Sequence, residues 1–144
     1  MATIFEIRDR IRKIDPKGIA ETIVYGSQDM IVSLNREQLR RGKDSTGYDI
    51  APSYRSDAYS AFKQDKNPLP EYGVPDLRNE GDFYDAMYFD IDAMNPYSSD
   101  PKTPSLVRKY GKHIFGLNEN SLNKFRPYFN QKFKEEVEYI VVSG

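Results

Sequence analysis

The residues best suited to do chemistry in this sequence are two alternating aspartates, Asp90 and Asp92, with Asp82 and Asp85 a short distance upstream. Residues two apart on a strand point to the same face. Paired carboxylates can bind a divalent metal or cleave a glycosidic bond. The polar face of an ordinary strand has the same spacing, and neighbouring Lys and Arg would neutralise it. We therefore favour a structural role and keep a metal-dependent enzyme, for instance a nuclease, as the third of three hypotheses.

Other catalytic or metal-binding residues are scarce. The only histidine, His113, has no serine nucleophile in a recognisable setting near it, and the chain has no cysteine for thiolate chemistry or zinc. The KDSTGYD segment at 43–49 lacks the alternating oxygen ligands and the distant Glu of a calcium loop. The glycine-rich phosphate-binding patterns are also absent. We predict that the protein is not an enzyme and has no cofactor and no metal site.

Charge and composition exclude further classes. The 21 basic and 22 acidic residues nearly cancel, which gives none of the broad positive potential typical of nucleic-acid binding. A basic cluster at 36–43 lies among acidic residues, which disfavours a phosphate patch. No apolar run is long enough to cross a membrane. The 11 Tyr and 8 Phe favour surfaces that are half buried or contacted by a partner, because tyrosine buries a ring and keeps its hydroxyl in water.

Helical periodicity is clearest near the N-terminus. Ile4, Ile7, Ile11 and Ile14 recur at spacings of three and four, which predicts an amphipathic helix. A second helix is predicted over 19–26. Because residues 30–34 (MIVSL) are rich in β-branched side chains, they predict a short strand.

Later segments alternate between helices and irregular connections. Asn35 and Gln38 have the spacing of a capping box, which predicts a short helix reaching Leu39. A helix is predicted over 54–66 and a half-buried strand over 87–92, and the three prolines of 68–75 preclude a regular element between them. The last helical region has one apolar stripe, and Pro127 predicts a kink or a break into two helices. The stripe is Leu122, Phe125, Phe129, Phe133, Val137 and Ile140.

These elements predict an α+β fold with a small antiparallel sheet, packed by N-terminal and C-terminal helices and carrying long assembly loops. The length of 144 residues suits a single domain. Within residues 1–144 we expect N-terminal helices at 3–26, a loop and small-sheet region at 30–95, and a C-terminal helical region at 105–142.

Three stretches together resemble a known family. They are QLRRGKDSTGYDIAPSY at 38–54, followed by a lysine-containing helix (AYSAFK), LRNEGDFYDAMYF at 77–89, and more loosely IFGLNENSLNKF at 114–125. Their order and turn residues are similar to the virion morphogenesis and tail-completion proteins of tailed bacteriophages. The first two stretches fall within 35–92, under half of the chain. The sequence departs from the family pattern where Ile50 replaces the usual Trp and where Glu80-Gly81-Asp82 replaces the common Thr-Gly-Arg.

The resemblance implies a structural virion protein of the neck or tail that acts in head–tail joining by forming a homo-oligomeric ring. The partners it implies are other copies of the chain, neighbouring portal, connector or tail proteins, and passive contact with DNA in a channel, with no membrane. It implies synthesis in the host cytoplasm and a final place in the virion.

The resemblance also implies site residues. The long loop would be an assembly arm, and loss of Tyr48 or Ile50 would prevent assembly and leave the fold intact. The second hypothesis is a non-enzymatic phage or bacterial binding module, an adaptor or inhibitor that uses a Tyr-rich surface. The implied interface residues are Gly42, Asp44, Gly47, Tyr48, Ile50, Pro52 and Tyr54, and the implied core and turn motif is Leu77, Gly81 and Phe83.

Overall fold

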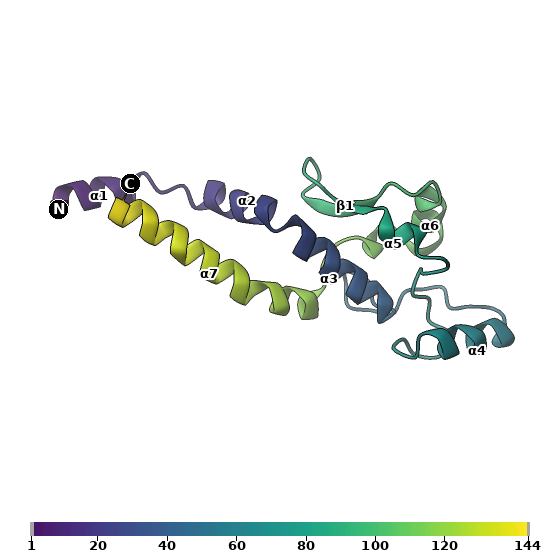
Figure 1. Cartoon of the computed structure of the whole chain (residues 1–144). Coiled ribbons are helices and arrows are strands. Elements are labelled where there is room, and N and C mark those ends of the chain that lie inside the picture. The colour runs from purple at the N-terminus through teal and green to yellow at the C-terminus, as the bar shows by residue number, and fades with distance from the viewer. Residues whose placement is uncertain (1, 144) are drawn as a thin grey trace. The chain divides into compact units, whose positions relative to one another are not determined.

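The computed structural model describes residues 2–143, and within them it contains helices and one small sheet (Figure 1). The α+β class predicted from the sequence is confirmed. No helix among the described residues combines the length and the apolar character that crossing a membrane requires. In chain order the elements are α1 (Ile4–Arg12), α2 (Pro16–Gly26), α3 (Gln28–Arg40), α4 (Asp57–Lys66), α5 (Asp82–Asp85), β1 (Met87–Asp90), β2 (Asn95–Ser98), α6 (Thr103–Tyr110), η1 (Lys112–Ile114) and α7 (Glu119–Ser143).

The described residues fall into two compact units. One unit contains residues 28–123, and the other contains residues 2–27 with 124–143. Helix α7 begins in the first unit and continues into the second. The single domain expected from the sequence stays a prediction.

The sheet of the 28–123 unit is a two-stranded antiparallel pair in which Met87 lies opposite Ser98 and Asp90 opposite Asn95. Met87 and Phe89 are buried, whereas Tyr88 between them is exposed, as the alternation predicted. The strand ends at Asp90, so Ile91 and Asp92 lie in the turn. The buried face of the sheet packs against α3 (Figure 1).

Helix α3 corrects the predicted strand at 30–34 and the predicted capping box at 35–38, because both lie inside this one helix. Its buried positions are spaced three and four apart, as a helix requires, but two of them carry amides instead of apolar side chains. The helical period of α3 is therefore not visible in a pattern based on hydrophobicity alone. The buried residues are Ile31, Val32, Asn35, Gln38 and Leu39.

The other unit is built from α1, α2 and the part of α7 that follows Asn123. The predicted stripe on α7 is confirmed here: Phe125 is buried, and Phe129, Phe133, Val137 and Ile140 are half-buried. The predicted break into two helices is wrong, because α7 continues through Pro127 as a single helix. The ring centroids of Phe125 and Phe129 are 6.0 Å apart, so apolar contact spans the proline and offsets part of its cost.

Candidate functional site

Two buried amides of α3 organise the 28–123 unit. The side chain of Asn35 donates from Nδ2 to the carbonyl of Ile114 (3.1 Å) and accepts at Oδ1 from the N–H of Gly116 (3.0 Å). Asn35 is fully buried, and the segment it binds begins at Ile114, the last residue of η1. An amide side chain can pair with the backbone N–H and carbonyl groups of an irregular segment, because it offers both a donor and an acceptor, as a neighbouring strand would.

Gln38, one turn later, extends the same arrangement. Its Nε2 donates to the carbonyl of Gly116 (2.8 Å), and its Oε1 accepts from the N–H of Asn118 (2.8 Å) and from the hydroxyl of Ser121 (2.9 Å). Asn118 in turn accepts at Oδ1 from the N–H of Ser121 (2.9 Å), at the start of α7. We call Asn35, Gln38, Asn118 and Ser121 the polar clamp. All four are buried.

The loop that follows α3 is a tight hairpin. The N–H of Ile50 donates to the carbonyl of Gly42 (2.8 Å), and the N–H of Asp44 donates to the carbonyl of Tyr48 (3.0 Å). Between these bonds Lys43 and Asp49 form a β-bridge, and their side chains form an ion pair. Residues 42–50, which we call the assembly loop, are therefore fixed by their own backbone.

The polar clamp also binds the assembly loop. Asn118 donates from Nδ2 to the carbonyl of Asp44 (3.2 Å), and the N–H of Lys43 donates to the backbone carbonyl of Gln38 (3.1 Å). The N–H of Ser45 donates to the carbonyl of His113 (2.7 Å). The loop thus joins the body of its unit by hydrogen bonds from both sides, and it is a rigid feature of that unit.

The two apolar residues of the loop have opposite environments. The side chain of Tyr48 is 77% exposed at the tip, whereas Ile50 is 2% exposed and lies in the core. The turn that precedes Tyr48 is closed by the side chain of Asp44, whose Oδ1 accepts from the N–H of Thr46 (2.9 Å). Tyr48 is therefore accessible at the surface, whereas Ile50 contributes to the stability of its own unit. This burial corrects the expectation that loss of Ile50 would leave the fold intact.

The two glycines of the loop also differ. A Cβ on Gly42, at φ +75°, would lie 2.8 Å from Val74 Cγ1 and 2.9 Å from Pro70 Cβ, whereas a Cβ on Gly47, at φ +90°, meets nothing within 4 Å. We expect Gly42→Ala to lower the free energy of unfolding by about 2–4 kcal/mol, through strain plus overpacking. Gly47→Ala should cost about 1–2 kcal/mol, through strain alone. Urea denaturation followed by circular dichroism measures both, and equal losses would contradict the packing argument.

The remaining residues implied by the resemblance take varied positions. Pro52 is exposed, and Tyr54 is half-buried with its N–H donating to the carbonyl of Gly73 (2.8 Å). Leu77 is half-buried with φ +58°, and Gly81 is buried with φ +92°. Phe83 is buried, and its ring centroid lies 5.8 Å from that of Phe115. The turn motif therefore places Phe83 against the segment held by the polar clamp.

A buried ion pair joins α4 to the segment before α5. Lys63 Nζ lies 2.8 Å from Asp76 Oδ1, and the two side chains are 12% and 4% exposed. The other Asp76 oxygen accepts from Asn67 Nδ2 (3.0 Å), and Oδ1 also accepts from the N–H of Arg78 (3.0 Å). The carboxylate is thus surrounded by donors, which is the condition under which a buried charge is tolerated.

The predicted pair of aspartates on one strand face does not form. Asp90 Oδ1 accepts from the N–H of Asp92 (3.0 Å) and from that of Ala93 (3.3 Å), so Asp90 closes the turn after β1. Asp92 lies in that turn instead of on the strand. Among residues 2–143, no three or more His, Asp or Glu side chains are grouped so that they could hold a metal ion.

Burial raises the pKa of two tyrosines near Asp76. The Tyr84 hydroxyl donates to the backbone carbonyl of Asp76. Burial, and then the charge of Asp76, raise the pKa of Tyr84 well above its ordinary value. Burial and Asp76 likewise raise the pKa of Tyr54. Both hydroxyls stay neutral in the folded protein at any pH near neutrality.

We expect alkaline pH to unfold the protein partly through Tyr84. A raised folded pKa means that the unfolded chain ionises first, so the contribution is complete below about pH 10 and is lost above it. The loss approaches about 1.4 kcal/mol per pH unit for this side chain. The ionisation of the tyrosines can be followed by their phenolate absorbance as the pH rises, and the chain has no Trp whose absorbance would overlap with it. Tyr84→Phe should reduce the pH dependence of the free energy of unfolding, and an unchanged pH dependence would contradict this assignment.

Comparison with known proteins adds nothing to this geometry. No family model, curated protein or solved structure matches the chain.

Sequence reasoning identified the assembly loop but missed what holds it. The spacing of Asn35 and Gln38 suggested helix-capping residues, and no feature of the sequence indicated that Asp76 is part of a buried ion pair. The signal that identifies Asn35 and Gln38 is their position between Ile31 and Leu39: Asn35 lies four residues from each of these, and Gln38 lies three residues after Asn35. Side-chain amides that are buried are usually hydrogen-bonded, as these two are.

Proposed function

We propose that this chain is a structural protein of the neck or tail of a tailed bacteriophage, without enzymatic activity, which joins head to tail by assembling into a homo-oligomeric ring. The observation that carries the proposal is the assembly loop. Its base is fixed by buried hydrogen bonds, and its tip exposes the ring of Tyr48. A rigid loop that presents an aromatic side chain loses little conformational entropy when a partner covers it.

The positions of the resembling stretches support the proposal. Gln38, in the first stretch, binds Gly116 and Asn118 in the last one. Phe83, in the middle stretch, contacts Phe115 in the last one. Three stretches that lie far apart in the sequence therefore meet in one unit. If the chain shares its fold with the family it resembles, the resembling residues are expected to be those that contact one another in this way.

The surface of the 28–123 unit also supports assembly. Tyr88 and Tyr97 lie opposite each other on the outer face of the sheet, with ring centroids 6.4 Å apart, and both are exposed. Exposed tyrosines are enriched where proteins contact each other. A ring needs two different surfaces on each copy. The loop tip and this sheet face offer two.

The location of the protein tests this proposal first. Antiserum raised against the purified chain would be used to label intact phage-like particles from its source for electron microscopy. We expect label at the head–tail junction. If particles carry no label and the chain is missing from denatured particles by immunoblot, the virion proposal is overturned. A tight one-to-one complex with another protein would then favour a binding module that uses the same tyrosines.

A matched pair of variants separates assembly from folding. We expect Tyr48→Ala to change the free energy of unfolding by no more than about 0.5 kcal/mol, because the side chain is exposed, and to lower incorporation into particles. Ile50→Ala removes a buried side chain and should cost about 2–5 kcal/mol. Urea denaturation measures the free energy of unfolding of both variants, and immunoblots of purified particles measure incorporation. Normal incorporation of Tyr48→Ala would contradict the proposed role of the loop tip.

A further inference from the structure

We propose that a second copy of this chain inserts its α1 into the groove between α2 and α7, so that two copies exchange their N-terminal helices. The inference rests on the self-assembly proposed above and names surfaces on the other unit, residues 2–27 with 124–143. Three observations support the exchange: an open groove between α2 and α7, an exposed apolar face on α1, and opposite charges beside the groove and beside that face.

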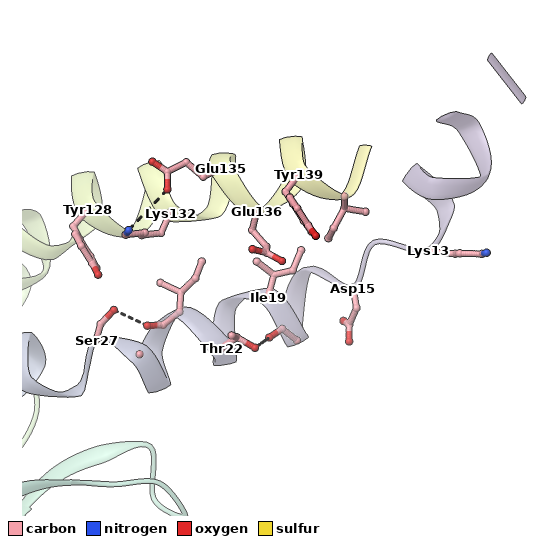
Figure 2. Close-up of a pocket in the computed structure, with 14 residues that line it drawn as sticks. Lys13, Asp15, Ile19, Thr22, Ser27, Tyr128, Lys132, Glu135, Glu136 and Tyr139 are labelled. Carbon is pink, nitrogen blue, oxygen red and sulfur yellow. Dashed lines mark hydrogen bonds and ion pairs between the residues drawn. The ribbon is translucent and has the colours of Figure 1, made fainter. Parts of the chain in front are cut away.

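The groove lies between α2 and α7, which run side by side with their side chains facing one another (Figure 2). Its volume is about 840 Å³. A cylinder of the diameter of an α-helix with its side chains occupies about 420–610 Å³ per turn, so the groove has room for roughly one and a half to two turns. The apolar part of its lining includes Ile19, Ile23, Tyr128, Tyr139 and Ile140.

The groove carries negative charge on its α7 side. Glu135 pairs with Lys132 at 3.9 Å, but Glu136 makes no ion pair within residues 2–143 (Figure 2). An apolar channel with an unpaired carboxylate on its edge suits an amphipathic segment whose apolar face is flanked by basic residues.

Helix α1 of the same chain has this pattern. None of its residues is buried, and Ile4, Phe5 and Ile11 are 77%, 65% and 52% exposed. Arg8, which also pairs with Asp9 at 3.4 Å, and Arg12 directly follow Ile7 and Ile11 of the isoleucine stripe. A helix that leaves its apolar face in water is typical of one that another surface covers.

The attachment of α1 to its own unit is compatible with exchange. Arg10 Nη1 donates to the carbonyls of Val141 (3.0 Å) and Val142 (3.1 Å) in the last turn of α7. The connection from α1 to α2 passes through Asp15, whose backbone is extended ahead of Pro16. Short connections of this kind act as hinges in reciprocal exchange, which buries the same two surfaces in both copies.

The absence of cysteine allows a direct test on the full chain. Two variants of different mass would be mixed and oxidised: Ile11→Cys on α1, and Thr22→Cys, which lines the groove from α2. Each copy then carries one cysteine, so a disulfide between positions 11 and 22 must join two copies. The control is Glu21→Cys, the adjacent exposed residue, which does not line the groove.

We expect a covalent mixed dimer with Thr22→Cys at a yield several-fold above that with Glu21→Cys. Glu136→Lys should reduce the yield several-fold, and adding Arg12→Glu should restore it. Glu138→Lys, outside the groove, should leave it unchanged. Equal yields for positions 21 and 22, with the helical circular dichroism of both variants intact, would overturn the exchange.

The outcomes separate this inference from the proposed function. A cross-link between positions 11 and 22 in the purified chain, with no label on particles, would keep the exchange and remove the virion role. Label at the head–tail junction without that cross-link would keep the virion role and overturn the exchange.

Discussion

Gln38→Met should lower the free energy of unfolding by about 3–5 kcal/mol. Methionine matches the length of glutamine, so the change removes hydrogen bonds and leaves no large cavity. The carbonyl of Gly116, the N–H of Asn118 and the hydroxyl of Ser121 would each lose a partner 2.8–2.9 Å away in a buried site. Each buried polar group left unpaired costs about 1–3 kcal/mol, less what local rearrangement recovers.

Urea denaturation followed by far-ultraviolet circular dichroism measures this loss. Ser33→Ala is the matched control, because Ser33 is exposed on the same helix, and it should change stability by no more than about 0.5 kcal/mol. Since the polar clamp also holds the assembly loop, Gln38→Met should increase amide hydrogen exchange at residues 43–48. A loop that stays protected after the change would show that its own backbone bonds suffice.

The helices that sequence reasoning placed well are those with a continuous apolar stripe at helical spacing. The isoleucine spacing predicted α1, and the stripe from Phe125 to Ile140 predicted α7. Helix α3 was missed because Asn35 and Gln38 occupy buried positions that the hydrophobic pattern treats as polar surface. The apparent strand was a consequence of the β-branched residues at 31 and 32. Tertiary hydrogen bonding, which a local pattern does not contain, decided this segment.

The candidate site was predictable in its location but not in its mechanics. Glycines and polar residues after α3 indicated a loop, and the structure has one at residues 42–50. The loop was expected to be an arm, yet its rigidity comes from partners about 70 residues later in the chain, such as Asn118. Spacing within the loop carries no information about those partners. For the same reason the opposite environments of Tyr48 and Ile50 required the folded structure.

The second large effect concerns the buried charge at Asp76. Its carboxylate accepts from Lys63, from Asn67 and from the N–H of Arg78. Asp76→Ala would leave Lys63 with no carboxylate in a site where its side chain is 12% exposed. Removing one partner of a buried ion pair costs about 3–5 kcal/mol, because the remaining charge stays desolvated. We expect a loss in that range by urea denaturation.

An exposed ion pair in the same unit provides the control. Glu37 pairs with Arg41 at 3.0 Å, but these side chains are 38% and 47% exposed, far more than those of the Lys63–Asp76 pair. Glu37→Ala should therefore cost no more than about 1 kcal/mol. Similar losses for Asp76→Ala and Glu37→Ala would contradict the conclusion that burial makes the Lys63–Asp76 pair the more costly one to break.

A double-mutant cycle then separates pairing from packing. Lys63→Met alone keeps the aliphatic part of the side chain and leaves Asp76 with Asn67 and the N–H of Arg78, so it should cost less than Asp76→Ala. Combining Lys63→Met with Asp76→Ala removes both charges, and the loss should be smaller than the sum of the two single losses by about 1–3 kcal/mol. The reason is that no uncompensated charge then stays buried. Additive losses would mean that Asp76 acts through Asn67 and the Arg78 backbone alone, and that α4 is held without the ion pair.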